Sequence, residues 1–372
     1  MQQNRLMKRT AVYCFLFMMT AMSAMLYYCA NKIIVVADVA QDEVLQEEAL
    51  QEESGQDETG KVTNGPGNDA GNQEEEGGQI RIDRKSQKTS YFCIPMPESV
   101  KPEEVTIENH YMDRELWVSV VSQKPDLQEQ FYKTNSVYGN CENVMKGYME
   151  AEEERFCLRF ELTDVYEYHS IFEDHTLYVE FMTPKETYDK IIVIDPAYGA
   201  GETGAATNQI SAKEITLEIA RALKDKLDNT DIKVYYTRMD DSNPSAESRV
   251  KLAEATKADM LIRIEVGGDQ NTKKYGTEAV YNSRFFIPGF GSVELADLLE
   301  REVVTSISGK ANGLLEAEEA DRVISDATVP AAAIKVGYLT NGQESILLQR
   351  EDYIQRIAEG IYQAVLKAYE NQ

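Results

Sequence analysis

The second half of the chain alternates short apolar runs with longer amphipathic stretches. Lys190–Ile194 is apolar after its first residue, as expected of a strand buried on both faces of a sheet. Ala212–Leu227 repeats apolar residues every three or four positions, which predicts a helix with one buried face. The same patterns predict strands at Ile232–Tyr236, Met260–Glu265, Thr277–Tyr281 and Ala332–Val336, and helices at Pro244–Lys257 (capped by Asn243), Ser292–Ile307 and Tyr353–Tyr369.

This order of elements predicts an α/β fold. Strands that alternate with helices form a mostly parallel sheet with helices on both faces. In such sheets the functional residues gather at the carboxyl ends of the strands. We therefore expect the chemistry of this half to lie just after the predicted strands.

The preceding block, residues 80–186, has shorter runs in which apolar and polar residues alternate, as in half-buried strands. Turn-like clusters at Pro95–Pro102 and Asn135–Asn140 separate some of the runs. We expect a small antiparallel β module. Its predicted strands are Ile80–Ile82, Val105–Ile107, Leu116–Val121, Cys157–Leu162 and Thr176–Met182, and its histidines, His110, His169 and His175, lack the spacing of metal ligands.

The amino-terminal part predicts export. Ala11–Ala30 carries no charge and is long enough to cross a bilayer as a helix, and Arg5, Lys8 and Arg9 precede it. By the positive-inside rule, residues 1–10 form a cytoplasmic basic tail and 11–30 a single transmembrane anchor. A cleaved signal peptide, processed near Ala37–Ala40, is the alternative. Residues 31–79 are acidic and poor in aromatic residues, which predicts a disordered linker.

Charge and cysteine content narrow the possible partners. The net charge of −26 argues against nucleic acid, because a phosphate backbone requires a basic surface. The exported part would hold Cys93, Cys141 and Cys157, which allow one disulfide and one free thiol, and the spacing leaves the pairing open. From Asp189 to Gln372 the sequence has neither histidine nor cysteine, so the usual zinc ligands are missing from the α/β half.

Motifs follow the predicted strands in a recognisable order. Their succession resembles the catalytic domain of zinc-dependent N-acetylmuramoyl-L-alanine amidases, over residues 187–372. The matching segments are Asp195–Gly201 (DPAYGAG) for DPGHGG, Lys213-Glu214 for a KE pair, Glu247–Ala255 for ERVxLAN, Arg263–Gly267 for SIHAN, Tyr275–Glu278 for a GxE strand and Val329–Asn341 for PAVLVELGFLSN.

The resemblance implies a reaction and a set of positions. The family hydrolyses the amide between the lactyl group of muramic acid and the first L-alanine of the stem peptide. The family's zinc ligands and general base correspond to Tyr198, Glu214, Glu265 and Lys335 in this sequence. Only Glu214 is the same residue type as in the family. A neutral phenol is a poor zinc ligand, and an ammonium cannot accept a proton from water. We therefore expect neither zinc nor activity, and no other cofactor.

A specific replacement for the metal follows from these residues. We hypothesise that Lys335 occupies the vacated metal position as a counter-ion facing Glu214 and Glu265. Arg263 supports it, because Arg263 and Glu265 project to the same face of one strand. The simpler interpretations are that Tyr198 packs at a strand end, Glu265 is solvated and Glu214 stabilises the amino terminus of its helix.

Three functions are consistent with the sequence. The first is a membrane-anchored, extracytoplasmic amidase-like protein that is inactive and binds peptidoglycan or a cell-envelope protein in a regulatory role. The second is an active N-acetylmuramoyl-L-alanine amidase with an atypical metal site, in which zinc or a hard cation such as Mg²⁺ or Mn²⁺ is held by Glu214 and Glu265. The third is a scaffold that binds a protein through the β module or the acidic linker.

Overall fold

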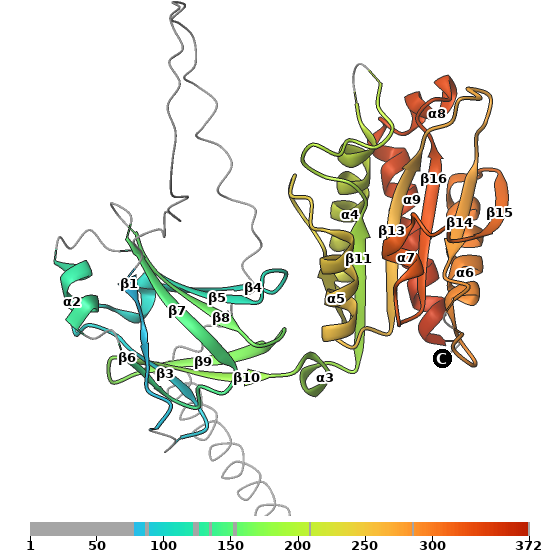
Figure 1. The fold of residues 1–372 in the computed structure, drawn as a ribbon. Coiled ribbons are helices and arrows are strands. Elements are labelled where there is room, and N and C mark those ends of the chain that lie inside the picture. The colour runs from blue at the N-terminus through green and yellow to red at the C-terminus, as the bar shows by residue number, and fades with distance from the viewer. Residues whose placement is uncertain are drawn as a thin grey trace, which may run out of the picture. The chain divides into compact units, whose positions relative to one another are not determined.

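The computed structural model describes residues 78–85, 89–121, 126–133, 136–151, 155–207, 210–284 and 286–370. These residues fall into two compact units. Unit 1 contains Arg114–Thr163, Tyr168–Phe181 and the chain before them up to His110, and unit 2 contains Tyr111–Asp113, Asp164–Glu167 and the chain from Met182 onward (Figure 1).

The predicted basic tail, the anchor at residues 11–30 and nearly all of the linker lie outside the described residues. Within the described ranges, no helix combines the length and apolar character needed to cross a membrane. The anchor therefore stays a prediction from the sequence.

Unit 1 is a β module of two five-stranded sheets, in the orders β1-β7-β8-β5-β4 and β2-β6-β3-β10-β9. Most of its neighbouring strands are antiparallel, and β2 and β6 run parallel. The strands are Gly78–Gln79 (β1), Arg81–Ile82 (β2), Phe92–Pro95 (β3), Val105–His110 (β4), Glu115–Val121 (β5), Ser136–Gly139 (β6), Val144–Ala151 (β7), Arg155–Leu162 (β8), Glu167–Glu173 (β9) and Thr176–Met182 (β10), with a 3-10 turn at Pro102–Glu104 (η1) and a helix at Leu127–Lys133 (α2).

The predicted alternating runs are strands in unit 1, but one predicted turn is wrong. The cluster Asn135–Asn140 contains β6, which pairs with β3 and places Val137 in the core. Cys93, Cys141 and Cys157 are all buried free thiols. None of them takes part in a disulfide, so the possible bridge is absent here.

Unit 2 is built on one six-stranded sheet in the order β12-β11-β13-β16-β14-β15. Its neighbours are parallel except for β14 and β16, which are antiparallel, so the predicted mostly parallel sheet is confirmed. The strands are Lys190–Pro196 (β11), Ile232–Tyr236 (β12), Met260–Gly267 (β13), Thr277–Tyr281 (β14), Ala311–Glu316 (β15) and Ala331–Tyr338 (β16).

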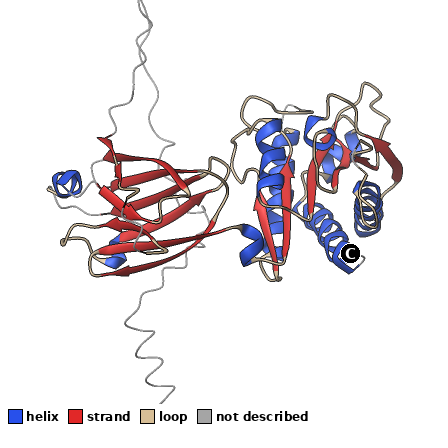
Figure 2. Cartoon of the chain, turned by 60° about the horizontal axis from the view of Figure 1, so that its bottom comes forward, coloured by secondary structure: helices blue, strands red, loops and turns tan. Residues whose placement is uncertain are grey.

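Helices cover both faces of this sheet, as predicted (Figures 1 and 2). One face packs its apolar side chains against α4 (Ala212–Leu227), α6 (Ser292–Ile307) and α9 (Glu351–Glu370). The other face packs against the shorter α5 (Ala246–Ala255) and α7 (Arg322–Ser325). The remaining helices are α3 (Pro184–Thr187) and α8 (Gly342–Leu347).

The start of one helix and one unpredicted strand are the main differences from the prediction. Helix α5 begins at Ala246, and its cap is Ser245, whose Oγ accepts a hydrogen bond from Ser248 N at 3.1 Å. Asn243 is not the cap, because its side chain accepts a hydrogen bond from Arg249 Nη2. Strand β15 was not predicted, since its residues are exposed or only partly buried and show no continuous apolar run.

Helix α9 contacts both α4 and α6. Its Gly360 lies against the backbone of α6, where an added Cβ would come within 2.6 Å of Val303 Cα. Only glycine permits so close an approach of the two helices.

Candidate functional site

Five charged residues from four neighbouring strands lie on one face of the sheet, near the carboxyl ends of β11, β13 and β16. Asp195 of β11 is the register partner of Arg263 of β13. Two residues further along β13, on the same face, Glu265 is the partner of Lys335 of β16. Lys335 is in turn the partner of Glu278 of β14, across the antiparallel pairing. Charged side chains therefore follow one another across the sheet.

Asp195 is fully buried and is held by two guanidinium groups. Arg249 Nη1, from α5, bonds to its Oδ1, and Arg263 Nη1 bonds to its Oδ2. The hydroxyl of Thr237 also donates to Oδ1, at 2.5 Å. Burial alone would raise the pKa of Asp195, but the charges of Arg263 and Arg249 outweigh it, so the pKa lies below the ordinary aspartate value.

Glu265 and Lys335 belong to adjacent ion pairs. Arg263 Nε donates to Glu265 Oε1 at 2.8 Å, so the Arg263 guanidinium joins Asp195 to Glu265. Lys335 Nζ donates to Glu278 Oε1 at 2.9 Å. Burial lowers the pKa of Lys335, but the hydrogen bond to Glu278 and the charge of Glu265 raise it more, and the pKa lies above the ordinary lysine value. Lys335 is therefore a cation at neutral pH.

Tyr198 follows β11 and adopts a left-handed backbone conformation, with φ of 70°. Arg249 Nη2 donates to its carbonyl oxygen at 3.0 Å, and its ring lies against Gly204. Burial, followed by the charge of Glu265, raises the pKa of Tyr198 to about 12. The side chain is thus a neutral phenol beside the charged row.

The hydrogen bonds of Glu214 are made outside this group. Glu214 is exposed in the first turn of α4, where its Oε2 accepts hydrogen bonds from Ser211 N and Ser211 Oγ, both at 2.7 Å. These hydrogen bonds lower its pKa. The simpler interpretation of Glu214, stabilisation of a helix amino terminus, describes its contacts.

The predicted counter-ion arrangement is therefore only partly right. Lys335 does neutralise a carboxylate, and Glu265 does act on it electrostatically. Among the described residues Lys335 forms its ion pair with Glu278 and none with Glu214, so the predicted pairing with Glu214 is not found. Arg263 has a larger role than predicted, since it bonds both Asp195 and Glu265.

Asp195, Arg249 and Glu278 were missed as members of the site, although all three lie inside the recognised motifs. The sequence signal for Asp195 was a carboxylate at the end of a continuous apolar run. For Glu278 no local signal existed, because its contact with Lys335 depends on the antiparallel direction of β14.

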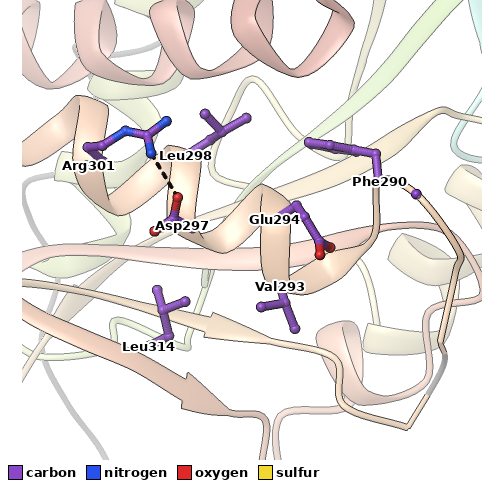
Figure 3. Close-up of a pocket in the computed structure, with 8 residues that line it drawn as sticks. Phe290, Val293, Glu294, Asp297, Leu298, Arg301 and Leu314 are labelled. Carbon is purple, nitrogen blue, oxygen red and sulfur yellow. Dashed lines mark hydrogen bonds and ion pairs between the residues drawn. The ribbon is translucent and has the colours of Figure 1, made fainter. Parts of the chain in front are cut away.

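A groove of about 440 Å³ lies elsewhere in unit 2, between α6 and β15 (Figure 3). Arg301 and Asp297 form an ion pair there at 3.0 Å. No predicted site residue lines this groove, so it is separate from the charged row. Its lining consists of Gly289, Phe290, Val293, Glu294, Asp297, Leu298, Arg301 and Leu314.

Comparisons with known proteins agree with the motifs. The family model described as N-acetylmuramoyl-L-alanine amidase matches residues 192–367. The germination-specific N-acetylmuramoyl-L-alanine amidase of Bacillus subtilis (strain 168) is 26% identical over 196 residues, which cover 48% of this chain and 80% of that protein. The crystal structure of N-acetylmuramoyl-L-alanine amidase from Clostridium difficile 630 is 30% identical and covers 49% of this chain and 98% of its own, with a TM-score of 0.46.

Residues 192–367 therefore belong to the N-acetylmuramoyl-L-alanine amidase family. The uncharacterised protein YqiI of Bacillus subtilis (strain 168) is also similar, with 28% identity over 181 residues, 49% of this chain and 85% of that protein. These matches cover about half of the chain.

The residues at the amidase-family positions do not fit a zinc ion. Lys335 is an ammonium in an ion pair, and Glu265 is hydrogen-bonded to a guanidinium. Glu214 is engaged by Ser211, and Tyr198 supplies only a neutral phenol. Within the described residues, no group of three or more histidine, cysteine, aspartate and glutamate side chains is arranged to hold a metal.

Proposed function

We propose that this amidase-family protein binds peptidoglycan outside the cytoplasm without hydrolysing it, and acts in the cell wall as a binding or regulatory protein. Its family supports peptidoglycan as the ligand. The observation that carries the loss of activity is the ion pair between Lys335 and Glu278, at the position where the resemblance expects a general base.

The chemistry of the charged row supports binding without hydrolysis. Amide hydrolysis needs a group that removes a proton from water. Lys335 is a cation at neutral pH and cannot do so. The phenol of Tyr198 is also protonated, because burial and the charge of Glu265 raise its pKa to about 12.

The alternative of an active amidase with a hard cation has less support. It requires Glu214 and Glu265 to hold the ion together. Glu214 bonds to the start of α4 and Glu265 to Arg263, so binding a cation would break both sets of contacts.

No contact in the charged row favours the alternative of a protein-binding scaffold. That alternative also predicts that the protein has no affinity for the cell wall. The extracytoplasmic location rests on the uncharged segment Ala11–Ala30 and on the family. With that segment as an anchor, the folded units face the wall from the membrane surface.

The decisive experiment incubates the full chain, solubilised in detergent, with isolated peptidoglycan sacculi. We expect co-sedimentation with the sacculi and no release of new alanine amino termini, with or without added zinc. The germination-specific amidase of Bacillus subtilis serves as the positive control for release. Release by the unmodified chain would overturn the proposed inactivity, and failure to co-sediment would overturn the proposed ligand.

A gain-of-function variant tests the inherited geometry. The triple substitution Tyr198→His, Glu265→His and Lys335→Glu restores the residue types that the resemblance expects. We expect zinc-dependent release of alanine amino termini from this variant and none from the unmodified chain. Equal release from both would show that these positions do not control activity.

A further inference from the structure

Several polar atoms of the charged row retain hydrogen-bonding capacity. Among the described residues, Arg263 donates through Nε and Nη1 only, which leaves Nη2 without an acceptor. Lys335 Nζ makes one hydrogen bond to the described residues, and its other N–H groups can still donate. Glu265 accepts through Oε1 only, so its Oε2 is open. Donors and one acceptor are therefore available side by side.

These open atoms are accessible from solvent. The side chains of Arg263, Glu265 and Lys335 are 14%, 16% and 22% exposed, whereas Asp195 is fully buried. Glu265 lies between the two cations, since it bonds to Arg263 and is the register partner of Lys335. A small group that reaches this face would meet the two cations and the carboxylate together.

The row is part of a larger network of ion pairs, and that network carries no net charge. Ion pairs join four cations to four carboxylates. Two more carboxylates act nearby, because Asp321 acts on both Tyr198 and Lys335, and Glu202 acts on Tyr198. The cations are Arg249, Arg263, Lys274 and Lys335, and the carboxylates are Asp195, Glu265, Asp269 and Glu278.

This balance favours a dipolar neutral ligand over an anion. The oxygen of an amide accepts hydrogen bonds from Lys335 and Arg263, while its N–H donates to Glu265 Oε2. A carboxylate offers the same oxygen but has no N–H, and its charge is repelled by Glu265. A surplus of carboxylates around the row adds to that repulsion.

We propose that Lys335, Arg263 and Glu265 form a binding site for an uncharged amide that discriminates against the corresponding carboxylate. The proposal rests on the proposed function, because it names the group of the cell-wall ligand that the site recognises. The protein then binds glycan whose lactyl group still carries its peptide, and releases glycan from which an active amidase has removed it.

The test compares two ligands that differ only in this group. N-acetylmuramic acid carries the free lactyl carboxylate, and its N-methylamide carries a neutral amide on the same sugar. NMR titration of the full chain measures both affinities. We expect the amide to bind about tenfold or more tightly than the acid, the effect of one hydrogen bond to a charged group. Equal affinity, tighter binding of the acid or no binding of either ligand would overturn the proposal.

Two variants separate recognition from folding. Glu265→Gln keeps an acceptor for Arg263 but removes the negative charge, so we expect it to bind the acid about tenfold more tightly than the unmodified chain does. Lys335→Met removes a donor for both ligands and should weaken both. The matched controls are Glu359→Gln and Lys224→Met, which remove ion-paired charges from α9 and α4 on the opposite face. An unchanged affinity of Glu265→Gln for the acid would contradict the assigned role of Glu265.

Failure of this proposal is distinguishable from failure of the proposed function. If the chain co-sediments with sacculi but does not prefer the amide, peptidoglycan binding stands and this site is not its cause. If the chain cleaves the peptide from sacculi, the proposed function fails whatever the preference between the two small ligands.

Discussion

Asp195 is the most enclosed charge of the row, and its removal tests whether the ion pairs hold the site together. Asp195→Asn leaves the guanidinium groups of Arg249 and Arg263 without their shared carboxylate. Breaking a buried ion pair from one side costs about 3–5 kcal/mol. We expect urea denaturation to show a loss of that order in the free energy of unfolding.

The control for Asp195 is Asp241→Asn. Asp241 pairs with Lys213, but its side chain is 66% exposed. Exposed ion pairs contribute about 0–1 kcal/mol, so this variant should unfold almost as the unmodified chain does. Similar losses for the two variants would mean that burial does not govern these ion pairs.

Gly204 tests the packing of Tyr198. An added Cβ at Gly204 would lie 2.6 Å from Tyr198 Cε2, and its φ of 65° disfavours any side chain. We expect Gly204→Ala to destabilise unit 2 by about 1–2 kcal/mol, measured by urea denaturation. Gly201→Ala is the matched control, because no atom lies within 4 Å of its Cβ position. A harmless Gly204→Ala would show that Tyr198 moves freely.

At the scale of elements, Glu214 is predicted to act as a helix cap. Glu294 makes the corresponding contact at the start of α6, where its Oε2 accepts a hydrogen bond from Gly291 N at 3.0 Å. We expect Glu214→Ala and Glu294→Ala each to lower the free energy of unfolding by about 1 kcal/mol. Neither should change the binding of sacculi. If only Glu214→Ala reduced the binding of sacculi, Glu214 would be a member of the binding site.

The elements of unit 2 could largely be predicted from the sequence, because buried strands and one-sided helices leave clear patterns. The bounds of α4 and α6 are as predicted, down to Ala212–Leu227 and Ser292–Ile307. The order of the motifs also identified four residues that lie in or beside the charged row. These were Tyr198, Arg263, Glu265 and Lys335.

The pairings within the row could not be predicted, because they depend on strand order and direction. Lys335 is in β16, which lies between β13 and β14. Only the antiparallel direction of β14 places Glu278 opposite Lys335. The role of Arg249 depends on the packing of α5 against the sheet. Strand β15 escaped prediction for another reason, since an edge strand need not be apolar.

For the whole molecule, the charged row predicts how stability depends on pH. Asp195 and Glu278 have lowered pKa values, so they stabilise the fold above the ordinary carboxyl pKa of about 4 and lose this effect as the pH falls through their folded values. Lys335 has a raised pKa, so its contribution is complete below the ordinary lysine pKa of about 10 and is lost as the pH rises through its folded value.

Urea midpoints measured across the pH range test this directly. We expect the acid decline to be shallower in Asp195→Asn than in the unmodified chain, because one of the carboxylates responsible is gone. The alkaline decline should be shallower in Lys335→Met. Identical acid profiles for Asp195→Asn and the unmodified chain would contradict the lowered pKa of Asp195.

Metal removal gives a further whole-molecule prediction. Because Glu265 and Lys335, at two of the family's site positions, are in ion pairs, we expect the fold of unit 2 not to depend on a metal. We expect dialysis against a chelator to shift the Tm by less than about 1 °C, since only a ligand bound to the native state raises it. Calorimetry before and after dialysis checks this, and a marked fall in Tm would indicate a bound metal.

The placement of α9 has a consequence for how the protein is made. This last helix contacts both α4 and α6 and contributes buried residues along most of its length. The central core of unit 2 therefore stays incomplete until the chain has been synthesised as far as residue 370. Such a domain folds only after its last helix has left the ribosome, because domains generally fold as units.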